Sequence, residues 1–470
     1  MPNECLNRRS LIGKSVDVCV LEMEQNRKLN FAGKQRFLLG VVASLCLLTA
    51  PVHADFQPIA GFDQQLFPSY LIATAAMRPN PTPDAYRLGD SLSLLGVEVK
   101  APAKDVEVKV AIECDDFCEK STFAGKLAEA NATYRITPKI KFRYDRLARC
   151  NQAAPTTVTF RVQLGNGPEE EQVVTCTMRS INDCPFAFRK GDEVVDASFA
   201  FAAYVNEQHP FVDKLLREAL DIGVVNRFTG YQTGKPEDVL LQAYALWDLL
   251  VARDVRYSSI TTTAAVSDTV YSQHVRLIEE SINNSQANCV DGSTLWVSLM
   301  RKIGINAFLV VTPDHCYAGF FADRDRKLCF AIETTLLGEA VDGDELEIPE
   351  FLDAAIPEDL RDEDSFASFV ASLELGTGRL AKKTETDGAG TPAERLIVDI
   401  GEMRKEGVLP IAFQNKEKFE WLSLADVDDD SDDEAEMEAP SEGDDSDSED
   451  TDSSEDDDTD SDDEDESMNR

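Results

Sequence analysis

Between residues 56 and 190, hydrophobic and polar positions alternate over short stretches that are rich in β-branched and aromatic residues. Turn residues such as Gly-Asn-Gly-Pro at 165–168 separate these stretches. A period of two is typical of strands with one buried face, and regularly spaced short strands favour an antiparallel sheet or sandwich. The pattern therefore predicts a β-rich, sandwich-like domain over 56–190. Its strands are expected at 106–110, 133–144, 157–164 and 171–178.

The hydrophobic period lengthens to that of a helix near Ala197. In 209–223, apolar residues recur at intervals of three and four, and Gly223 provides a stop. The stretch 239–259 is apolar over most of its length, which predicts a second, more buried helix.

Three apolar stretches then predict strands at 306–312, 315–321 and 328–335. The polar turn 323–327 joins the last two strands into a hairpin. Helices followed by strands over 191–345 predict a core domain of the α+β class.

The register of this hairpin decides which side chains share a face. The simplest register places Phe321 opposite Leu328. His315 then falls opposite Thr334, and Glu333 lies on the other face of the sheet. A change of one residue would instead place His315 directly opposite Glu333. The sequence leaves both registers open.

Charge is distributed unevenly along the 470 residues. The chain carries 87 Asp and Glu against 46 Lys and Arg, a net charge of -41, and 26 of the acidic residues lie in 426–470 with one basic residue. A block of like charge with few apolar residues predicts a disordered, solubilising tail. A second interpretation is weak, diffuse Ca²⁺ binding, since this tail lacks the loop of an EF-hand.

The N-terminal segment has the organisation of a secretion signal. Basic residues between 27 and 36 precede the apolar run 37–48, and Val52 and Ala54 form an A-x-A-like cleavage pattern. The apolar run is too short to span a bilayer of about 30 Å as a helix. We therefore expect 1–54 to be a signal peptide and the mature protein to be exported, without a stable membrane span. The alternatives are a buried helix and an uncleaved anchor.

Five cysteines fall in the predicted β-rich domain. In an exported protein we expect some of them to form disulfides, although the odd number allows two bridges at most within the domain. Zinc at Cys114-x3-Cys118 is the alternative, and the absence of histidine from 55–190 favours disulfides. The five are Cys114, Cys118, Cys150, Cys176 and Cys184.

Cys289 has the sequence context of a reactive thiol. It stands where polar residues give way to a helical pattern that is closed by Gly304. A helix N-terminus stabilises a thiolate through its unpaired N–H groups and its dipole. The hairpin downstream offers His315 as a base and Glu333 as a carboxylate to orient it, which completes a nucleophile–base–orienter arrangement.

These residues carry a resemblance to a known family. Residues 197–340 resemble the transglutaminase-like (papain-like) superfamily, bacterial exported type, whose members have G-N-C-x-D, P-G-H-A and I-E-T-T segments in that order. Here the segments are A-N-C-V-D at 287–291, P-D-H-C at 313–316 and I-E-T-T at 332–335. Ala287 and Asp314 replace the two family glycines, and Asp314 changes the charge near the expected pocket.

The resemblance implies a helix bearing Cys289 packed on an antiparallel sheet, with His315 as the base and Glu333 as its orienter. Gln273 is a candidate oxyanion donor or substrate-positioning residue, with a surface glutamine as the alternative. Asp291 is expected to cap the helix rather than to take part in chemistry. No resident metal or cofactor is implied.

Three functions are consistent with this site. The first is an exported cysteine hydrolase that cleaves peptide or amide bonds through an acyl-enzyme at Cys289. The second is acyl transfer to an amine, and the third is an inactive domain that binds peptide or cell-surface material. The expected partner is a protein or peptide, since so acidic a chain does not suit nucleic acid. The oligomeric state is left open.

Beyond the core, 346–425 is expected to be an extension. Its first part, to about residue 375, is acidic and helix-prone, and 376–392 is rich in Gly and Thr and predicts a linker. The segment 394–424 is expected to return to the core as a strand or short helix.

Overall fold

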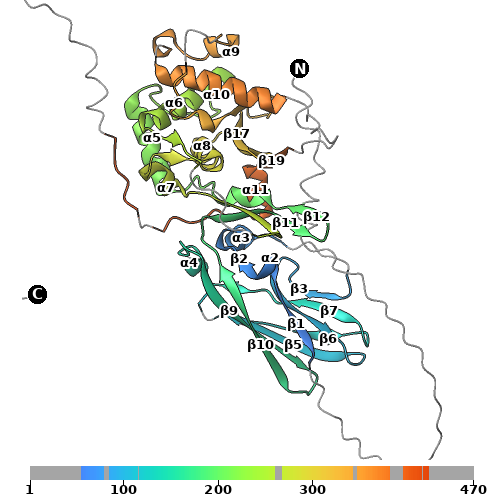
Figure 1. Cartoon of the computed structure of the whole chain (residues 1–470). Helices are drawn as coiled ribbons and strands as arrows, with labels where there is room; N and C mark the ends of the chain where they lie inside the picture. Colours follow the sequence, from blue (N-terminus) through green and yellow to red (C-terminus); the bar gives the residue numbers. More distant parts are fainter. Residues whose placement is uncertain are drawn as a thin grey trace, which may run out of the picture. The chain divides into compact units, whose positions relative to one another are not determined.

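The computed structural model describes eight stretches of the chain: 54–78, 84–114, 116–259, 267–341, 347–361, 363–381, 395–414 and 417–422. The predicted signal peptide, apart from Ala54, and the acidic tail lie outside the described residues. Among the residues that are described, no helix is long and apolar enough to cross a membrane. The fold is mixed α+β, as the sequence predicts (Figure 1).

The first part of the chain forms two sheets with a shared apolar interior (Figure 1). All four predicted strand regions are confirmed, and 133–144 divides into two strands. The interior follows from the alternation: along β9, every second side chain from Thr156 to Leu164 is buried. One sheet has the order β1 (Phe56–Ala60), β4 (Leu95–Lys100), β7 (Thr133–Thr137), β3 (Arg87–Gly89). The other has the order β2 (Gln65–Leu66), β10 (Glu169–Met178), β9 (Ala154–Leu164), β5 (Val106–Cys114), β6 (Cys118–Leu127), β8 (Lys141–Phe142).

A three-stranded sheet joins the two predicted regions of the chain. Its central strand β11 (Asp183–Lys190) pairs with β12 (Glu193–Asp196) and with β14 (Val270–His274), both antiparallel. Residues predicted at the end of the first region therefore share a sheet with a strand from the second. Two short helical segments contact β11: α3 (Pro68–Ala73) and the 3₁₀ turn η1 (Ser198–Ala203). The first part of the chain also contains the short segments α2 (Gly61–Gln64) and α4 (Tyr144–Leu147).

Four helices follow, and the predicted ones are present. Helix α5 (Pro210–Ile222) ends at Gly223, whose φ of 100° is the left-handed conformation that favours glycine. Helix α6 (Pro236–Ala252) is shorter than predicted, because Asp254 turns left-handed at φ 53°. Strand β13 (Arg256–Tyr257) follows and pairs with β15 (Gln286–Ala287). The other two helices are α7 (Ile278–Asn283) and α8 (Cys289–Lys302).

Helix α8 packs against a four-stranded antiparallel sheet (Figure 1). Trp296 of this helix is fully buried, with its ring edge to face against that of Phe320 in the sheet. The two faces of this sheet contribute to separate apolar clusters: Phe320 belongs to the main core, and Tyr317 packs with Leu380 in a second, smaller cluster. The strand order is β18 (Cys329–Ile332), β17 (Cys316–Phe321), β16 (Ala307–Val311), β19 (Leu396–Asp399).

The C-terminal extension is helical over a longer stretch than predicted. Helix α10 (Asp364–Ala381) continues through residues that we expected to begin a linker. Gly376 lies in this helix because it faces the backbone of β18, where a Cβ would come within 2.5 Å of the Ala331 carbonyl oxygen. The predicted return to the core is confirmed as β19 and α11 (Ile400–Glu406), and α9 (Glu350–Asp353) and the 3₁₀ turn η4 (Glu358–Leu360) precede α10.

Candidate active site

Cys289 is the first residue of α8, as the sequence predicts. The side chain of Asn288 caps the helix, accepting hydrogen bonds from the backbone N–H of Val290 and Asp291 at 2.9 Å each. Asp291 in return accepts from the N–H of Asn288 at 2.9 Å, which forms a capping box. The cap fixes the first helical turn, so the half-buried thiol of Cys289 is held at the positive end of the helix dipole.

Asp291 is a structural residue, in agreement with the prediction. Its buried carboxylate accepts from the backbone N–H of Arg276 at 2.8 Å and from the Arg276 guanidinium at 2.8 Å. Burial raises the pKa of Asp291, and the hydrogen bonds from Asn288 and Arg276 oppose that shift. These bonds tie the chain before α7 to the start of α8.

His315 and Glu333 are in direct contact. The imidazole Nε2 of His315 lies 2.8 Å from Oε2 of Glu333, whose side chain is fully buried. The ring of His315 also stacks on that of Tyr317, with centroids 6.0 Å apart and planes inclined by 27°. Two neighbours therefore fix the orientation of the imidazole.

The hairpin register differs from both registers that the sequence leaves open, Phe321 opposite Leu328 and His315 opposite Glu333. Phe321 lies opposite Cys329 and Ala318 lies opposite Ile332, one residue away from the simplest prediction. Odd-numbered residues of both strands therefore share a face, so His315 and Glu333 come together as diagonal neighbours rather than as a directly opposed pair.

The reason for the shift lies in the turn. Asp323 Oδ1 accepts hydrogen bonds from the N–H groups of Lys327 and Leu328 at 2.9 and 2.6 Å. Ala322 then bonds to the carbonyl of Leu328 at 2.9 Å, so Ala322 and not Phe321 is the residue that closes the turn opposite Leu328.

Cys289, His315 and Glu333 form one connected set. Nε2 of His315 contacts Glu333, and Cys289 lies near enough to the imidazole to act on its pKa. Burial alone would lower the pKa of His315. The hydrogen bond with Cys289, and the hydrogen bond and charge of Glu333, instead raise the pKa to about 9.

Glu333 shows the complementary shift. Burial would raise its pKa, but the hydrogen bond and charge of His315, with smaller contributions from Thr335 and Arg379, lower the pKa below its ordinary value. The two shifts together favour an imidazolium ion at His315 beside an ionised Glu333.

Thr334, the residue after Glu333, connects this part of the chain to the start of α8. The hydroxyl of Thr334, in the 3₁₀ turn η2 (Thr334–Leu336), lies 3.3 Å from that of Ser293 and donates to the carbonyl of Cys289 at 3.5 Å. Ser293 donates to the same carbonyl at 2.6 Å. Gly292 allows the approach, because a Cβ there would lie 3.0 Å from Thr334.

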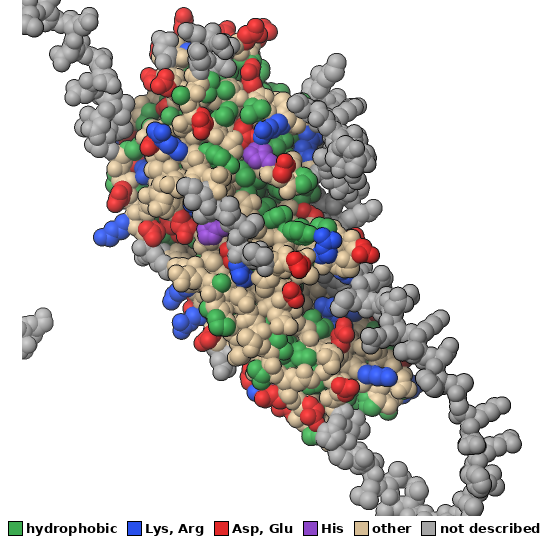
Figure 2. Space-filling model, viewed as in Figure 1, with side chains coloured by type: hydrophobic (Ala, Val, Ile, Leu, Met, Phe, Trp, Pro, Cys, Tyr) green, Lys and Arg blue, Asp and Glu red, His purple; other side chains and the backbone are tan. Residues whose placement is uncertain are grey.

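Two further residues border the site, and the sequence did not reveal either. Arg379, on α10, forms an ion pair with Glu333. Tyr257, on β13, is 37% exposed, and its pKa is raised by burial and then by the nearby charges of Cys289 and Glu333. Both come from segments distant in sequence and without a motif. Acidic and basic side chains are interspersed on the face shown in Figure 2, so no single sign of charge dominates that surface.

Gln273 stands on β14, opposite Cys184. The backbone carbonyl of the neighbouring His274 accepts a hydrogen bond from the side-chain amide of Asn288 at 3.3 Å. This strand therefore passes next to the cap of α8. No hydrogen bond in the described part of the chain joins Gln273 to the three candidate catalytic residues. Its role as an oxyanion donor stays a prediction.

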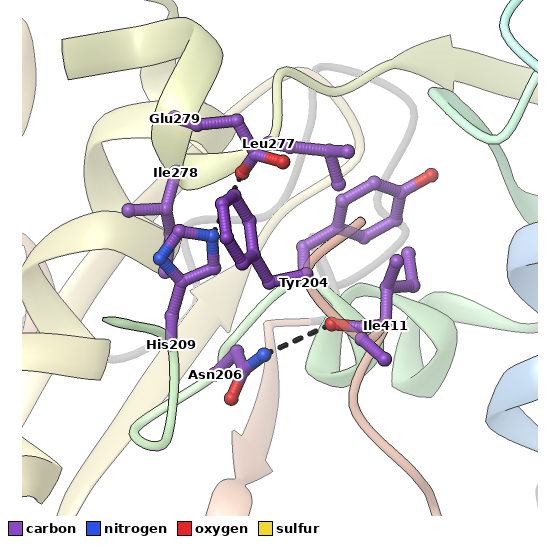
Figure 3. A pocket seen from close by; sticks show the side chains of 9 residues that line it. Tyr204, Asn206, His209, Leu277, Ile278, Glu279 and Ile411 are labelled. Atoms are coloured by element: carbon purple, nitrogen blue, oxygen red, sulfur yellow. Dashed lines mark hydrogen bonds and ion pairs between the residues drawn. The ribbon is translucent and has the colours of Figure 1, made fainter. Parts of the chain in front are cut away.

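A second buried His–Glu pair is separate from this site and lines a cavity of only about 10 Å³ (Figure 3). His209 Nδ1 accepts from the N–H of Phe211, and Nε2 lies 2.9 Å from Oε2 of Glu279. The ring also contacts Phe413 edge to face, at 4.7 Å. Such a cavity holds one water molecule at most, so His209 is a helix cap that also packs the returning chain.

The eight described cysteines carry free thiols in this structure. Cys114 lies directly opposite Cys118 across β5 and β6, and the pairing of cysteines in an exported protein stays a prediction. Cys316 and Cys329 are not opposed to each other, because the register places Cys316 opposite Val311 and Cys329 opposite Phe321. Within the described stretches, no group of three or more His, Cys, Asp and Glu could hold a metal ion.

Neither the models of known protein families nor the sequences of curated proteins give a match to this chain.

Proposed function

We propose that this chain is an exported, transglutaminase-like cysteine hydrolase that cleaves peptide or amide bonds through an acyl-enzyme at Cys289. The observation that carries the proposal is the grouping of three side chains: a cysteine at a capped helix N-terminus, near a histidine whose Nε2 bonds to a fully buried carboxylate. The cleavage pattern before Asp55 supports export.

The chemistry follows from the protonation state of the pair. The thiolate of Cys289 attacks the carbonyl carbon and forms a C–S bond, while the carbonyl electrons move to oxygen. When the tetrahedral intermediate collapses, the imidazolium of His315 gives its proton to the departing amine. Water then attacks the thioester as His315 takes a proton from it, the C–S bond breaks, and a carboxylic acid leaves with the Cys289 thiolate and the His315 imidazolium restored. Glu333 stays ionised and stabilises the imidazolium.

Thiol labelling and substrate profiling test this proposal together. Iodoacetamide at pH 6 should label Cys289 in the wild-type protein, and His315→Gln should slow this labelling about tenfold or more, since the thiolate loses its counter-ion. Cleavage of a peptide library should be abolished by Cys289→Ala. Cys150, a half-buried cysteine away from the site, is the matched control, and Cys150→Ala should change neither result.

Slow labelling that does not depend on His315, together with no cleavage of any peptide, would favour a binding domain and contradict the proposal. If the acyl group passes to an added primary amine more readily than to water, the second step is transamidation and the hydrolase assignment is wrong.

A further inference from the structure

Helix α10 covers the free edge of the sheet that carries the site. Strand β18 is an edge strand, and side chains of α10 satisfy its outward backbone groups. Thr377 Oγ1 accepts from the N–H of Ala331 at 3.1 Å and donates to its carbonyl at 3.2 Å. Ser372 Oγ makes the same two contacts with Glu333, at 3.0 and 2.9 Å. The helix thus replaces a neighbouring strand along this edge.

The helix presents one row of residues to Glu333. Ser372, Gly376 and Arg379 are separated by four and three positions, so they lie on one face of α10. Ser372 holds the backbone of Glu333, and Gly376 permits close contact with β18. The side chain that follows on this face, Arg379, reaches the carboxylate itself.

The carboxylate of Glu333 interacts with both His315 and Arg379. Arg379 Nη1 donates to Oε2, the same oxygen that contacts His315. The other oxygen, Oε1, accepts from the hydroxyl of Thr335 at 2.9 Å and from its N–H at 3.3 Å. One buried negative charge therefore faces two cationic groups, and the guanidinium is the more exposed of them, at 41%.

We propose, resting on the proposed function, that Arg379 is a positioning residue of the active site. Arg379 competes with His315 for the negative charge of Glu333 and thereby sets how strongly Glu333 stabilises the imidazolium. Ser372 and Thr335 hold Glu333 without help from Arg379. Removal of the guanidinium therefore leaves the carboxylate in place and makes its full charge available to His315.

Other ionisable groups around His315 belong to several elements. Cys289 on α8 and Glu333 after β18 contact it directly, and Tyr317 on β17 stacks on it. Arg395 lies beside Tyr317 and donates to the carbonyl oxygens of Arg379 and Leu380, so its charge acts from further away. The nearest neighbour in sequence is Asp314, which bonds to Thr312.

An NMR titration of the His315 ring tests this role, because it reads the imidazole whether or not a substrate is turned over. The chain has four histidines, and the His315→Gln variant assigns the signal. In Arg379→Gln the titration should move to higher pH by about half a unit to one unit, and Arg379→Lys should return it toward wild type. Arg217→Gln removes an exposed arginine of α5 that pairs with Asp221, and it should move nothing.

An unchanged or lower titration midpoint in Arg379→Gln, or a failure of lysine to restore it, would overturn the proposal. If Arg379→Gln does not fold, Arg379→Met provides the uncharged variant. Failure of the proposed function is a separate result: Cys289 would then be unreactive in the wild-type protein, while the titration still reports whether Arg379 competes for Glu333.

Discussion

At the scale of single residues, the site depends on one buried carboxylate. Glu333 is fully buried and keeps its charge only because His315, Thr335 and Arg379 surround it. An isolated buried carboxylate would instead take up a proton. Together with Cys289, Glu333 in turn raises the pKa of His315, so that His315 remains protonated above neutral pH.

Glu333→Gln should therefore lower the pKa of His315. The value of about 9 should fall toward the ordinary value of about 6.5, because the amide cannot stabilise the imidazolium by charge. Because the pKa of His315 is raised, the imidazolium is present below that pKa and is lost as the pH rises through it. The variant should therefore lose the imidazolium at lower pH. The His315 NMR titration and the alkaline limb of the cleavage rate measure this shift.

The matched control for this experiment is Glu279→Gln, which alters the other buried His–Glu pair. This substitution should alter the hydrogen bond between His209 and residue 279 and leave the titration midpoint of His315 unchanged. An alkaline limb near pH 9 in Glu333→Gln would mean that Glu333 does not hold the imidazolium.

The three candidate catalytic residues could be predicted from the sequence because each belongs to a local pattern. Cys289 follows a capping residue, and His315 and Glu333 belong to the two strands of one hairpin. Arg379 could not be predicted, because it lies 46 positions from Glu333 and next to Gly and Thr residues that are typical of linkers. Only the packing of α10 on β18 brings it to the site.

At the scale of elements, the alternation of residues predicts strands well and their register poorly. The faces of β17 follow from the period of two, but the pairing with β18 depends on the hydrogen bonds of Asp323 within the turn. A slip of one residue changes the face on which Glu333 lies. The pattern alone therefore could not decide whether the side chains of His315 and Glu333 are in contact.

The contact between α10 and β18 can be tested with two glycines of the same helix. Gly376→Ala places a Cβ within 2.5 Å of the Ala331 carbonyl, so we expect a loss of about 1–3 kcal/mol in the free energy of unfolding. At Gly378, no atom lies within 4 Å of an added Cβ, and alanine should stabilise the helix by up to about 1 kcal/mol. Urea unfolding curves of the two variants give both values.

Because both substitutions raise helix propensity equally, opposite signs isolate the contact with β18. Stabilisation by both would show that α10 does not pack closely on this strand. Gly376→Ala should also displace Arg379 from Glu333, so the His315 titration is a second measurement on the same protein.

At the scale of the whole molecule, the predicted export and the cysteines of the β-rich part bear on one another. In the oxidising environment outside the cytoplasm, a pair of opposed cysteines forms a disulfide. Cys114 and Cys118 are opposed across an antiparallel pair of strands, where Cα atoms lie about 4.5–5.5 Å apart, within the range that a disulfide requires.

Protein purified from an oxidising compartment should therefore carry a Cys114–Cys118 disulfide and a free Cys289. The bridge closes a loop of only a few residues, so its loss in Cys114→Ser with Cys118→Ser should cost about 2 kcal/mol, at the lower end of the usual range. Peptide mapping without reduction identifies the linked pair, and urea unfolding measures the difference. Cys176, whose pKa is raised to about 11 by burial and by the neighbouring Cys114, is the competing partner. A Cys114–Cys176 bridge would show that strand register does not determine the pairing, and full reduction of all three thiols in this material would show that the opposed cysteines do not form a disulfide.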